Sequence, residues 1–270
     1  MNHDCAEIIE INEHVRVRIE YALDPLNPRE EYDNVATMAC WHRRYNLGDV
    51  QPSEDPGDFR IRLLEGAGVD TGCPHCAGSG RTDDGDCEAC DGYGERPIDE
   101  LREEWERLFY SLPLYLYDHS GITMSTGSFS CPWDSGQVGF IYVTKERAHQ
   151  EWGTTLMQQR RDPDTGALLS GLVPVRPMTD EDYLQRLRNE VETYDQYLTG
   201  DVYGYVVEVG HTDEEGDFVV DEEGDSCWGI FGIDCARDDA RCAGEAAAKR
   251  HEAELQERDY WAQRDVATEA

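Results

Sequence analysis

Four cysteines in two matching groups form the clearest chemical motif of the sequence. Cys73-Pro-His-Cys76 and Cys87-Glu-Ala-Cys90 are each continued so that both groups follow the pattern C-x-x-C-x-G-x-G. A C-x-x-C turn directs both sulfurs at one ion, and the glycines let the backbone curl behind it. Four thiolates complete a tetrahedral shell. We therefore expect one structural zinc ion with no open position for a substrate.

Two alternatives exist for these cysteines: loop cysteines without a metal, and redox disulfides. Duplicated C-x-x-C spacing is rare by chance, and neither pair lies in the strand–helix context of a redox motif, so zinc is the preferred interpretation. His75 lies inside the first group. Because four cysteines already fill the shell, we expect His75 to be a solvated loop residue.

The repeated unit resembles the cysteine-rich zinc module of J-protein chaperones, which uses the same C-x-x-C-x-G-x-G pattern. That module has four copies, whereas this chain has two and lacks the HPD tripeptide of a J domain. The resemblance covers only residues 73–94. It implies a zinc fold and, at most, a role in protein binding.

A second group of reactive side chains lies between two apolar stretches. Cys131 could act as a thiol nucleophile, with His119 as its base and Asp118 or Asp134 as the orienting acid. A structural role is the preferred alternative, with Cys131 buried, His119 capping a turn and Trp133 packed in the core. Residue types of this kind occur close together by chance, so their presence alone does not establish catalysis.

Three further stretches have a possible chemical use and a preferred structural one. In the stretch 40–44 (Cys-Trp-His-Arg-Arg), an aromatic ring beside two arginines could stack a base or bind phosphate, but a buried Cys-Trp pair with solvated arginines is preferred. Cys227, Cys235 and Cys242, with His211, match no common metal spacing, so we expect three core thiols. Residues 213–225 could bind Ca²⁺, but they lack the EF-hand pattern and are expected to form two solvated turns.

The charge of the chain disfavours several classes of partner. It has 58 acidic and 24 basic side chains, a net charge of −34, and only Lys145 and Lys249 are lysines. Direct binding of nucleic-acid phosphates and attraction to an anionic membrane are both disfavoured. With 39% hydrophobic and 10% aromatic residues, the chain is nevertheless expected to fold. Abundant Asp and Glu with arginine-biased cations favour a protein adapted to a salt-rich cytoplasm.

The compartment is expected to be a reducing cytoplasm. The first ten residues contain no basic region followed by an apolar one, so they are not a signal peptide. No apolar run approaches the ~20 residues of a membrane span. In the absence of a secretion signal, ten cysteines favour metal ligands and reduced thiols over disulfides.

Hydrophobic periodicity predicts the elements that position these side chains. Residues 101–150 carry only six acidic and four basic side chains and are the expected centre of the core. Strands are expected at 15–21, 59–63, 114–117, 138–143, 203–209, 218–220 and 227–233, and helices at 98–110, at 180–199 with Thr179 as N-cap and Gly200 as stop, and from about 238. The predicted class is α+β, a mainly antiparallel sheet with flanking helices. Residues 1–65 and 97–270 would form a single domain, and 66–96 a zinc-binding insert.

A second resemblance covers most of the chain outside the zinc insert. It rests on the blocks Asn34–Asp49, Tyr117–Gly127, Phe129–Thr144, Gly200–Glu208 and Cys227–Gly229. These blocks are similar to an uncharacterised protein family of tailed phages and related mobile elements. The resemblance implies a viral or mobile-element origin and assigns no role to any residue. A virus of a halophilic host would combine this origin with the acidic composition.

Three functions are compatible with these features. The preferred one is a zinc-containing, non-enzymatic accessory protein of such a virus, acting through contacts with a host or viral protein in the host cytoplasm. The first alternative is a thiol-dependent hydrolase that uses the loop at 117–135. The second is an acidic DNA mimic that inhibits a host nucleic-acid-binding protein. The sequence defines no oligomeric state and leaves association with the virion open.

Overall fold

The computed structural model describes residues 5–97, 99–162 and 168–268. The chain folds into two compact units, residues 1–31 with 193–270, and residues 32–192. Helices and antiparallel sheets occur together, which confirms the predicted α+β class. The sequence predicts one domain around an insert at 66–96, whereas the structure has two units, and the insert belongs to the second.

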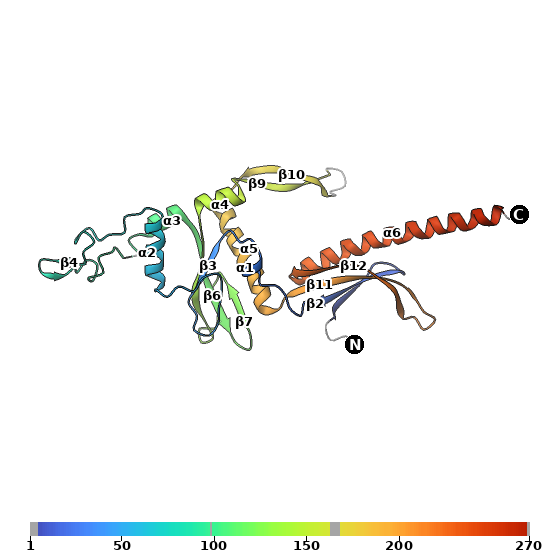
Figure 1. Cartoon of the computed structure of the whole chain (residues 1–270), viewed down its shortest axis with the longest axis horizontal. Coiled ribbons are helices and arrows are strands. Elements are labelled where there is room, and N and C mark those ends of the chain that lie inside the picture. The colour runs from blue at the N-terminus through green and yellow to red at the C-terminus, as the bar shows by residue number, and fades with distance from the viewer. Residues whose placement is uncertain (1–4, 98, 163–167, 269–270) are drawn as a thin grey trace. The chain divides into compact units, whose positions relative to one another are not determined.

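The first unit is a four-stranded antiparallel sheet covered by one long helix (Figure 1). Val15, Val17 and Ile19 are fully buried and pack with three alanines of the helix, Ala236, Ala240 and Ala247. These small side chains let the helix lie close to the sheet. The strand order is β1 (Cys5–Glu10), β2 (Val15–Tyr21), β11 (Val202–Thr212), β12 (Phe218–Phe231), and the helix is α6 (Ile233–Thr268).

The opposite face of this sheet holds a partly buried ion cluster. Glu208 is only 4% exposed, and its carboxylate accepts hydrogen bonds from Arg16 at 2.7 Å and from Arg18 at 2.9 Å. Phe218 covers the Arg16 guanidinium at 4.4 Å. The arginines that alternate with the apolar residues of β2 therefore neutralise a buried acid.

The second unit contains a four-stranded antiparallel sheet whose core is rich in aromatic residues. Phe59, Trp105, Phe109 and Phe140 pack together from two helices and two strands. The guanidinium of Arg60 lies 4.4 Å from the Phe140 ring centre, and its buried Nε has no hydrogen-bond partner among the described residues. The strand order is β3 (Thr37–Cys40), β8 (Ser135–Thr144), β6 (Phe109–Asp118), β7 (Ile122–Ser125), and the helices are α2 (Pro56–Gly66) and α3 (Arg102–Leu108).

Smaller elements complete the fold. The cysteine repeat encloses a short hairpin, β4 (Arg81–Thr82) with β5 (Gly85–Asp86). The others are α1 (Pro28–Glu31), α4 (Lys145–Trp152), the hairpin β9 (Thr155–Arg161) with β10 (Leu168–Pro177), and α5 (Asp180–Thr199). The Thr179 N–H donates to the Asp182 carboxylate at 2.7 Å, and Gly200 follows α5 at φ +76°. Both predicted ends of this helix are thus confirmed.

Two predicted elements differ in the structure. Residues 59–63, predicted as a strand, lie inside α2. Asp55 caps this helix by accepting from the amides of Gly57 and Asp58, and Pro56 occupies its first turn. The helix predicted at 98–110 is shorter, because β6 begins at Phe109 and pairs with Thr144 of β8. Ile98, part of that predicted helix, lies outside the described residues.

Two further predictions about residues 213–242 are wrong. Only the first acidic run forms a turn, and residues 221–225 lie within one continuous strand, β12, that also replaces the two short strands predicted there. The thiols of Cys227, Cys235 and Cys242, predicted to be in the core, are exposed. Cys227 lies in β12, and Cys235 and Cys242 lie in α6, which starts at Ile233. This helix packs alanines rather than cysteines against the sheet.

Candidate functional site

The four predicted cysteine ligands converge on one point. Their Sγ atoms all lie within 4.8 Å of one another, and all four residues are buried. Sulfur–sulfur distances are 3.9 Å for Cys73–Cys87 and 3.8 Å for Cys76–Cys90. A tetrahedral ion with metal–sulfur bonds of ~2.3 Å would hold its ligands about 3.8 Å apart. A disulfide requires ~2.05 Å, so the cluster has the dimensions of a metal site and not of two disulfides.

The two cysteine groups are held by the same hydrogen bonds in each half. The Gly80 amide donates to Cys76 Sγ at 3.3 Å, and the Gly94 amide donates to Cys90 Sγ at 3.2 Å. The halves are also joined, because Cys73 N–H donates to Gly94 O and Cys87 N–H donates to Gly80 O, each at 2.8 Å. The sequence repeat therefore corresponds to a repeated structure with approximate two-fold symmetry.

Two glycines are required where the halves meet. A Cβ at Gly80 would lie 2.2 Å from the Gly92 carbonyl oxygen, and one at Gly94 would lie 2.5 Å from the Gly78 carbonyl oxygen. Both glycines also adopt positive φ, +74° and +81°. Only glycine combines this conformation with so close a backbone approach.

The thiols differ in how readily they ionise. Burial raises the pKa of Cys76, but the Gly80 amide and the neighbouring cysteines outweigh it, and the pKa falls to about 7. At Cys90 burial prevails, the other cysteines add to it, and the pKa rises to about 11. Of these two thiols, Cys76 therefore ionises more readily than Cys90, and a bound cation would favour the thiolate form of both.

The cluster can stabilise a fold, but its shell has no position for catalysis. Four sulfurs fill a tetrahedral shell and exclude water from the ion. His75 is exposed, as the sequence predicts. The buried cluster in this region consists of the four cysteines alone. Metal–sulfur bonds would therefore replace the hydrophobic core that this segment lacks.

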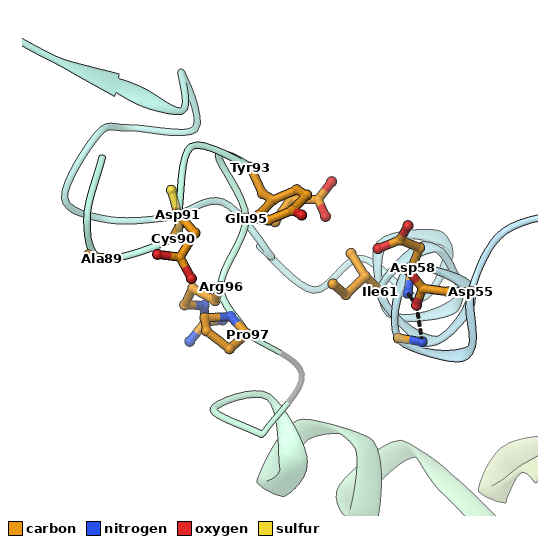
Figure 2. A pocket seen from close by; sticks show the side chains of 11 residues that line it. Asp55, Asp58, Ile61, Ala89, Cys90, Asp91, Tyr93, Glu95, Arg96 and Pro97 are labelled. Atoms are coloured by element: carbon orange, nitrogen blue, oxygen red, sulfur yellow. Dashed lines mark hydrogen bonds between the residues drawn. The ribbon is translucent and has the colours of Figure 1, made fainter. Parts of the chain in front are cut away.

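A groove lies between α2 and the second cysteine group (Figure 2). It comprises two adjoining cavities of about 310 and 470 Å³ that share Asp58, Ile61, Tyr93 and Glu95. Tyr93 is 82% exposed although it directly precedes the glycine that supports Cys90. Figure 2 shows Tyr93 and Glu95 facing the side chains of α2. The sequence did not reveal this groove, because its two walls come from separate segments.

The carboxylates of the groove repel one another. Burial, followed by the charges of Glu65 and Asp58, raises the pKa of Glu95. Burial and the neighbouring Asp55 raise the pKa of Asp58. Glu54 is different, because its pKa is lowered. A backbone hydrogen bond is the main cause, and the ion pair with Arg62 at 2.7 Å adds to it. A positively charged occupant would relieve the repulsion at Glu95 and Asp58.

A second site, the Trp133 cleft, joins two stretches that the sequence left separate. It is a cavity of about 320 Å³ lined by the loop after β3, the end of β6, and the residues before and at the start of β8. The polar and aromatic lining residues are His42, Arg44, Asp118, Trp133, Asp134 and Ser135. The N–H of Asp118 donates to the Asp134 carbonyl oxygen at 2.8 Å and ties the two strand ends together.

Asp118 holds the loop after β3 in place. Its carboxylate accepts from the Arg44 guanidinium and from the Tyr45 hydroxyl, the latter at 3.2 Å. His42 stacks on Tyr45 with ring centres 5.0 Å apart, and its Nδ1 accepts the Tyr45 N–H at 3.1 Å. The neutral imidazole therefore carries its proton on Nε2. Asp118 thus binds Arg44 and Tyr45, and does not orient a catalytic histidine as the triad hypothesis requires.

The residues considered for thiol catalysis do not form a linked triad in the described part of the chain. The Cys131 thiol lies 3.6 Å from an Asp134 carboxylate oxygen, and Ser135 Oγ donates to the Cys131 carbonyl oxygen at 2.5 Å. No hydrogen bond between the described side chains joins His119 to Cys131; the His119 ring instead stacks on Tyr117, 6.1 Å away. Cys131 is half-buried, and Trp133, expected in the core, is 91% exposed.

Trp41 is half-buried and packs against the aromatic core, so the buried Cys-Trp pair preferred for the stretch 40–44 is confirmed for Cys40 and only in part for Trp41. Its Nε1 donates to the Glu54 carbonyl oxygen at 2.7 Å, and its ring packs on Phe59 and Phe140. Cys40 is buried, and Arg43 and Arg44 are exposed. Trp41 is therefore not the ring on which a base could stack at this site.

None of the helices in the described ranges is long and apolar enough to span a bilayer. His211 pairs with Asp221 at 2.9 Å across β11 and β12, and among the described residues the four cysteines form the only group of ligand side chains close enough to share one ion. No known protein family matches the sequence, and no curated protein or solved structure is significantly similar to it.

Proposed function

We propose that the protein is a zinc-containing accessory protein that acts through contacts with another protein. The observation that carries this proposal is the closed four-cysteine cluster, which builds one wall of an open acidic groove. A shell of four sulfurs leaves no position for chemistry, so its contribution is to hold Tyr93 and Glu95 opposite α2. The metal would thus shape a docking surface.

Zinc is the metal that this donor set favours. Thiolate ligands select Zn²⁺, Cu(I) or iron–sulfur clusters over hard cations, and a tetrahedral site of four sulfurs is typical of structural zinc. The sulfur–sulfur distances of 3.8 and 3.9 Å agree with a single ion. We expect about one zinc per chain, and metal analysis by plasma mass spectrometry measures it directly. A folded, metal-free protein with four free thiols in the cluster would contradict this part of the proposal.

The partner segment should be cationic and extended. Asp58 and Glu95 have no ion pair with a described residue, and an exposed ring, Tyr93, lies beside them. An arginine can place its guanidinium between the carboxylates and its stem over the ring. A small metal ion is a poorer occupant, because the described residues of the groove include no group of three carboxylates close enough to share one.

A labelled Gly-Arg-Gly-Arg-Gly peptide tests this surface. Binding is measured by fluorescence anisotropy in about 1 M KCl, where the Debye length of ~3 Å suppresses general attraction to the acidic chain. Tyr93→Ala and Glu95→Gln should each weaken binding about three- to tenfold. Glu103→Gln removes the same charge from exposed α3 and should leave binding unchanged. Equal losses in Glu95→Gln and Glu103→Gln would show that only net charge attracts the peptide.

The origin and setting of the protein form the second part of the proposal. The phage-like blocks support a viral or mobile-element origin, and the net charge of −34 supports a halophilic host, with activity in the host cytoplasm. Screening by salt relieves the repulsion among surface carboxylates. The thermal midpoint should therefore rise from low to molar KCl, as followed by circular dichroism. A flat or falling midpoint would argue against a halophilic origin.

A further inference from the structure

The Trp133 cleft has the size and the polar lining of a small-ligand site. Its volume of about 320 Å³ lies at the lower end of the ~300–1,000 Å³ typical of such sites. Its walls come from the loop after β3 and from the joined ends of β6 and β8. Rigid strands therefore support the groups that reach into it. The cleft is separate from the four-cysteine cluster and shares no lining residue with the acidic groove.

Trp133 supplies an aromatic surface at this cleft. It is 91% exposed, while another tryptophan of the same unit, Trp105, is buried in the aromatic core. Tryptophan is the largest apolar side chain and usually has most of its surface covered. A solvent-exposed indole ring beside a cavity can stack on a flat ligand, and such stacking accepts different heteroaromatic rings in the ligand.

Hydrogen-bond donors accompany this ring. Because His42 Nδ1 accepts a backbone amide, the Nε2 of the neutral ring carries a proton. The Asp118 carboxylate holds the Arg44 guanidinium through one of its terminal nitrogens. Arg44 is 67% exposed, and its other N–H groups are available to an anion. With Arg43 beside it, this loop places two arginines together in a chain of net charge −34.

From these observations we propose that the Trp133 cleft binds a planar heteroaromatic ring that carries an anionic group, which is the chemistry of a nucleotide. The ring stacks on Trp133, and the phosphate meets Arg44 and the Nε2–H of His42. The source is a free mononucleotide rather than a nucleic-acid strand. Further phosphates of a strand would be repelled by the surrounding carboxylates, because the chain carries a net charge of −34.

Isothermal titration calorimetry in about 1 M KCl tests the proposal with adenosine 5′-monophosphate, adenosine and a single-stranded dodecamer of deoxyadenosine. The wild type should bind the mononucleotide. Trp133→Ala should weaken binding of both small ligands about tenfold or more. Arg44→Gln should weaken binding of the mononucleotide and leave binding of adenosine nearly unchanged, because only the phosphate loses a partner. Trp228→Ala, at a half-exposed tryptophan of β12, is the matched control and should bind as the wild type does.

Several results would overturn the proposal. These are no heat of binding with millimolar mononucleotide, unchanged affinity in Trp133→Ala, or equal losses in Trp133→Ala and Trp228→Ala. A dodecamer that binds more tightly per site than the mononucleotide would overturn the free-ligand source and assign the cleft to nucleic-acid strands. Trp133 and Arg44 are exposed, so both variants should fold, and retained metal content with an unchanged circular dichroism spectrum verifies it.

Discussion

The four-cysteine cluster draws its ligands from residues 73–90, whereas the Trp133 cleft combines the loop after β3 with the ends of β6 and β8. Both lie in the second unit. Hydrogen bonds between two short loops, and sulfurs spaced for one ion, shape the cluster. Strand register and the contacts of Asp118 shape the cleft. The cluster would therefore depend on a bound ion, whereas the cleft depends on the sheet.

This difference predicts that the two sites can be lost separately. The cluster has no apolar core beyond its own cysteines, so removal of the ion should leave the sheet intact. None of the four cysteines lines the cleft, so a disturbed sheet edge should leave metal binding at the cluster intact. Metal removal tests whether the cleft survives loss of the cluster, and mutations in the sheet test whether the cluster survives loss of the cleft.

Metal removal should have the largest effect. A strong chelator at neutral pH should disorder residues 73–94 and abolish peptide binding at the acidic groove, while mononucleotide binding persists. Structural zinc contributes ~10–16 kcal/mol in small modules, which no other contact in this segment can replace. Acidification should act in the same direction, because protons compete for the thiolates, so metal is bound at neutral pH and released as the pH falls. Amide NMR spectra and thiol titration measure the change. Dispersed amide signals from the segment after chelation would mean that it folds without metal.

Gly139→Ala should disrupt the Trp133 cleft and leave the four-cysteine cluster intact. A Cβ at Gly139 would lie 2.0 Å from the Ala39 carbonyl oxygen, so β3 would have to move away from β8 and carry its following loop with it. Such overpacking costs ~1–3 kcal/mol or more. Mononucleotide binding should be lost while one metal per chain is retained. Gly127→Ala, where a Cβ would meet only Ser125 Oγ at 3.8 Å, is the control in urea denaturation. Loss of metal in Gly139→Ala would show that the two sites are coupled.

Glycine substitutions within the cluster should produce a smaller, graded effect. Gly78 and Gly94 both have positive φ, +79° and +81°, but only a Cβ at Gly94 would clash, 2.5 Å from the Gly78 carbonyl oxygen. An alanine in this conformation costs roughly 1 kcal/mol. Gly78→Ala should therefore weaken metal binding several-fold, and Gly94→Ala at least tenfold more. Competition with a chromophoric chelator measures both affinities, and similar values would indicate that the halves can shift apart freely.

Tyr45→Phe should have the smallest effect, confined to the cleft. It removes the hydroxyl that donates to Asp118 at 3.2 Å, a hydrogen bond worth ~0.5–1.5 kcal/mol. We expect the unfolding free energy to fall by about 1 kcal/mol and mononucleotide affinity to fall two- to threefold, because Asp118 then orients Arg44 less firmly. Urea denaturation and calorimetry provide the two values. Unchanged affinity would mean that the ion pair with Asp118 orients Arg44 without help from the Tyr45 hydroxyl.

Elements with a local signal were predictable from the sequence. The alternation in residues 15–21 predicts β2, and the stripe with Thr179 and Gly200 at its ends predicts α5. Residues 59–63 alternate between apolar and charged side chains as regularly as those of β2, yet they form a helix. Asp55 caps this helix, and its buried face includes Leu64, one residue beyond the predicted strand. Periodicity over five residues cannot distinguish these outcomes when capping and tertiary packing decide between them.

The sequence by itself determined the four-cysteine cluster that can hold a metal ion, because the cysteines lie within two short repeats and their spacing requires no knowledge of the rest of the chain. It also determined the class of fold and the solvated acidic exterior. Only the tertiary structure placed Tyr93 opposite α2, and only it brought His42 and Arg44 to Asp118 and exposed Trp133 beside them. At the Trp133 cleft, the contact of Arg44 with Asp118 joins residues 74 positions apart. Strand pairing, which follows from burial over the whole sheet, places the end of β6 that carries Asp118.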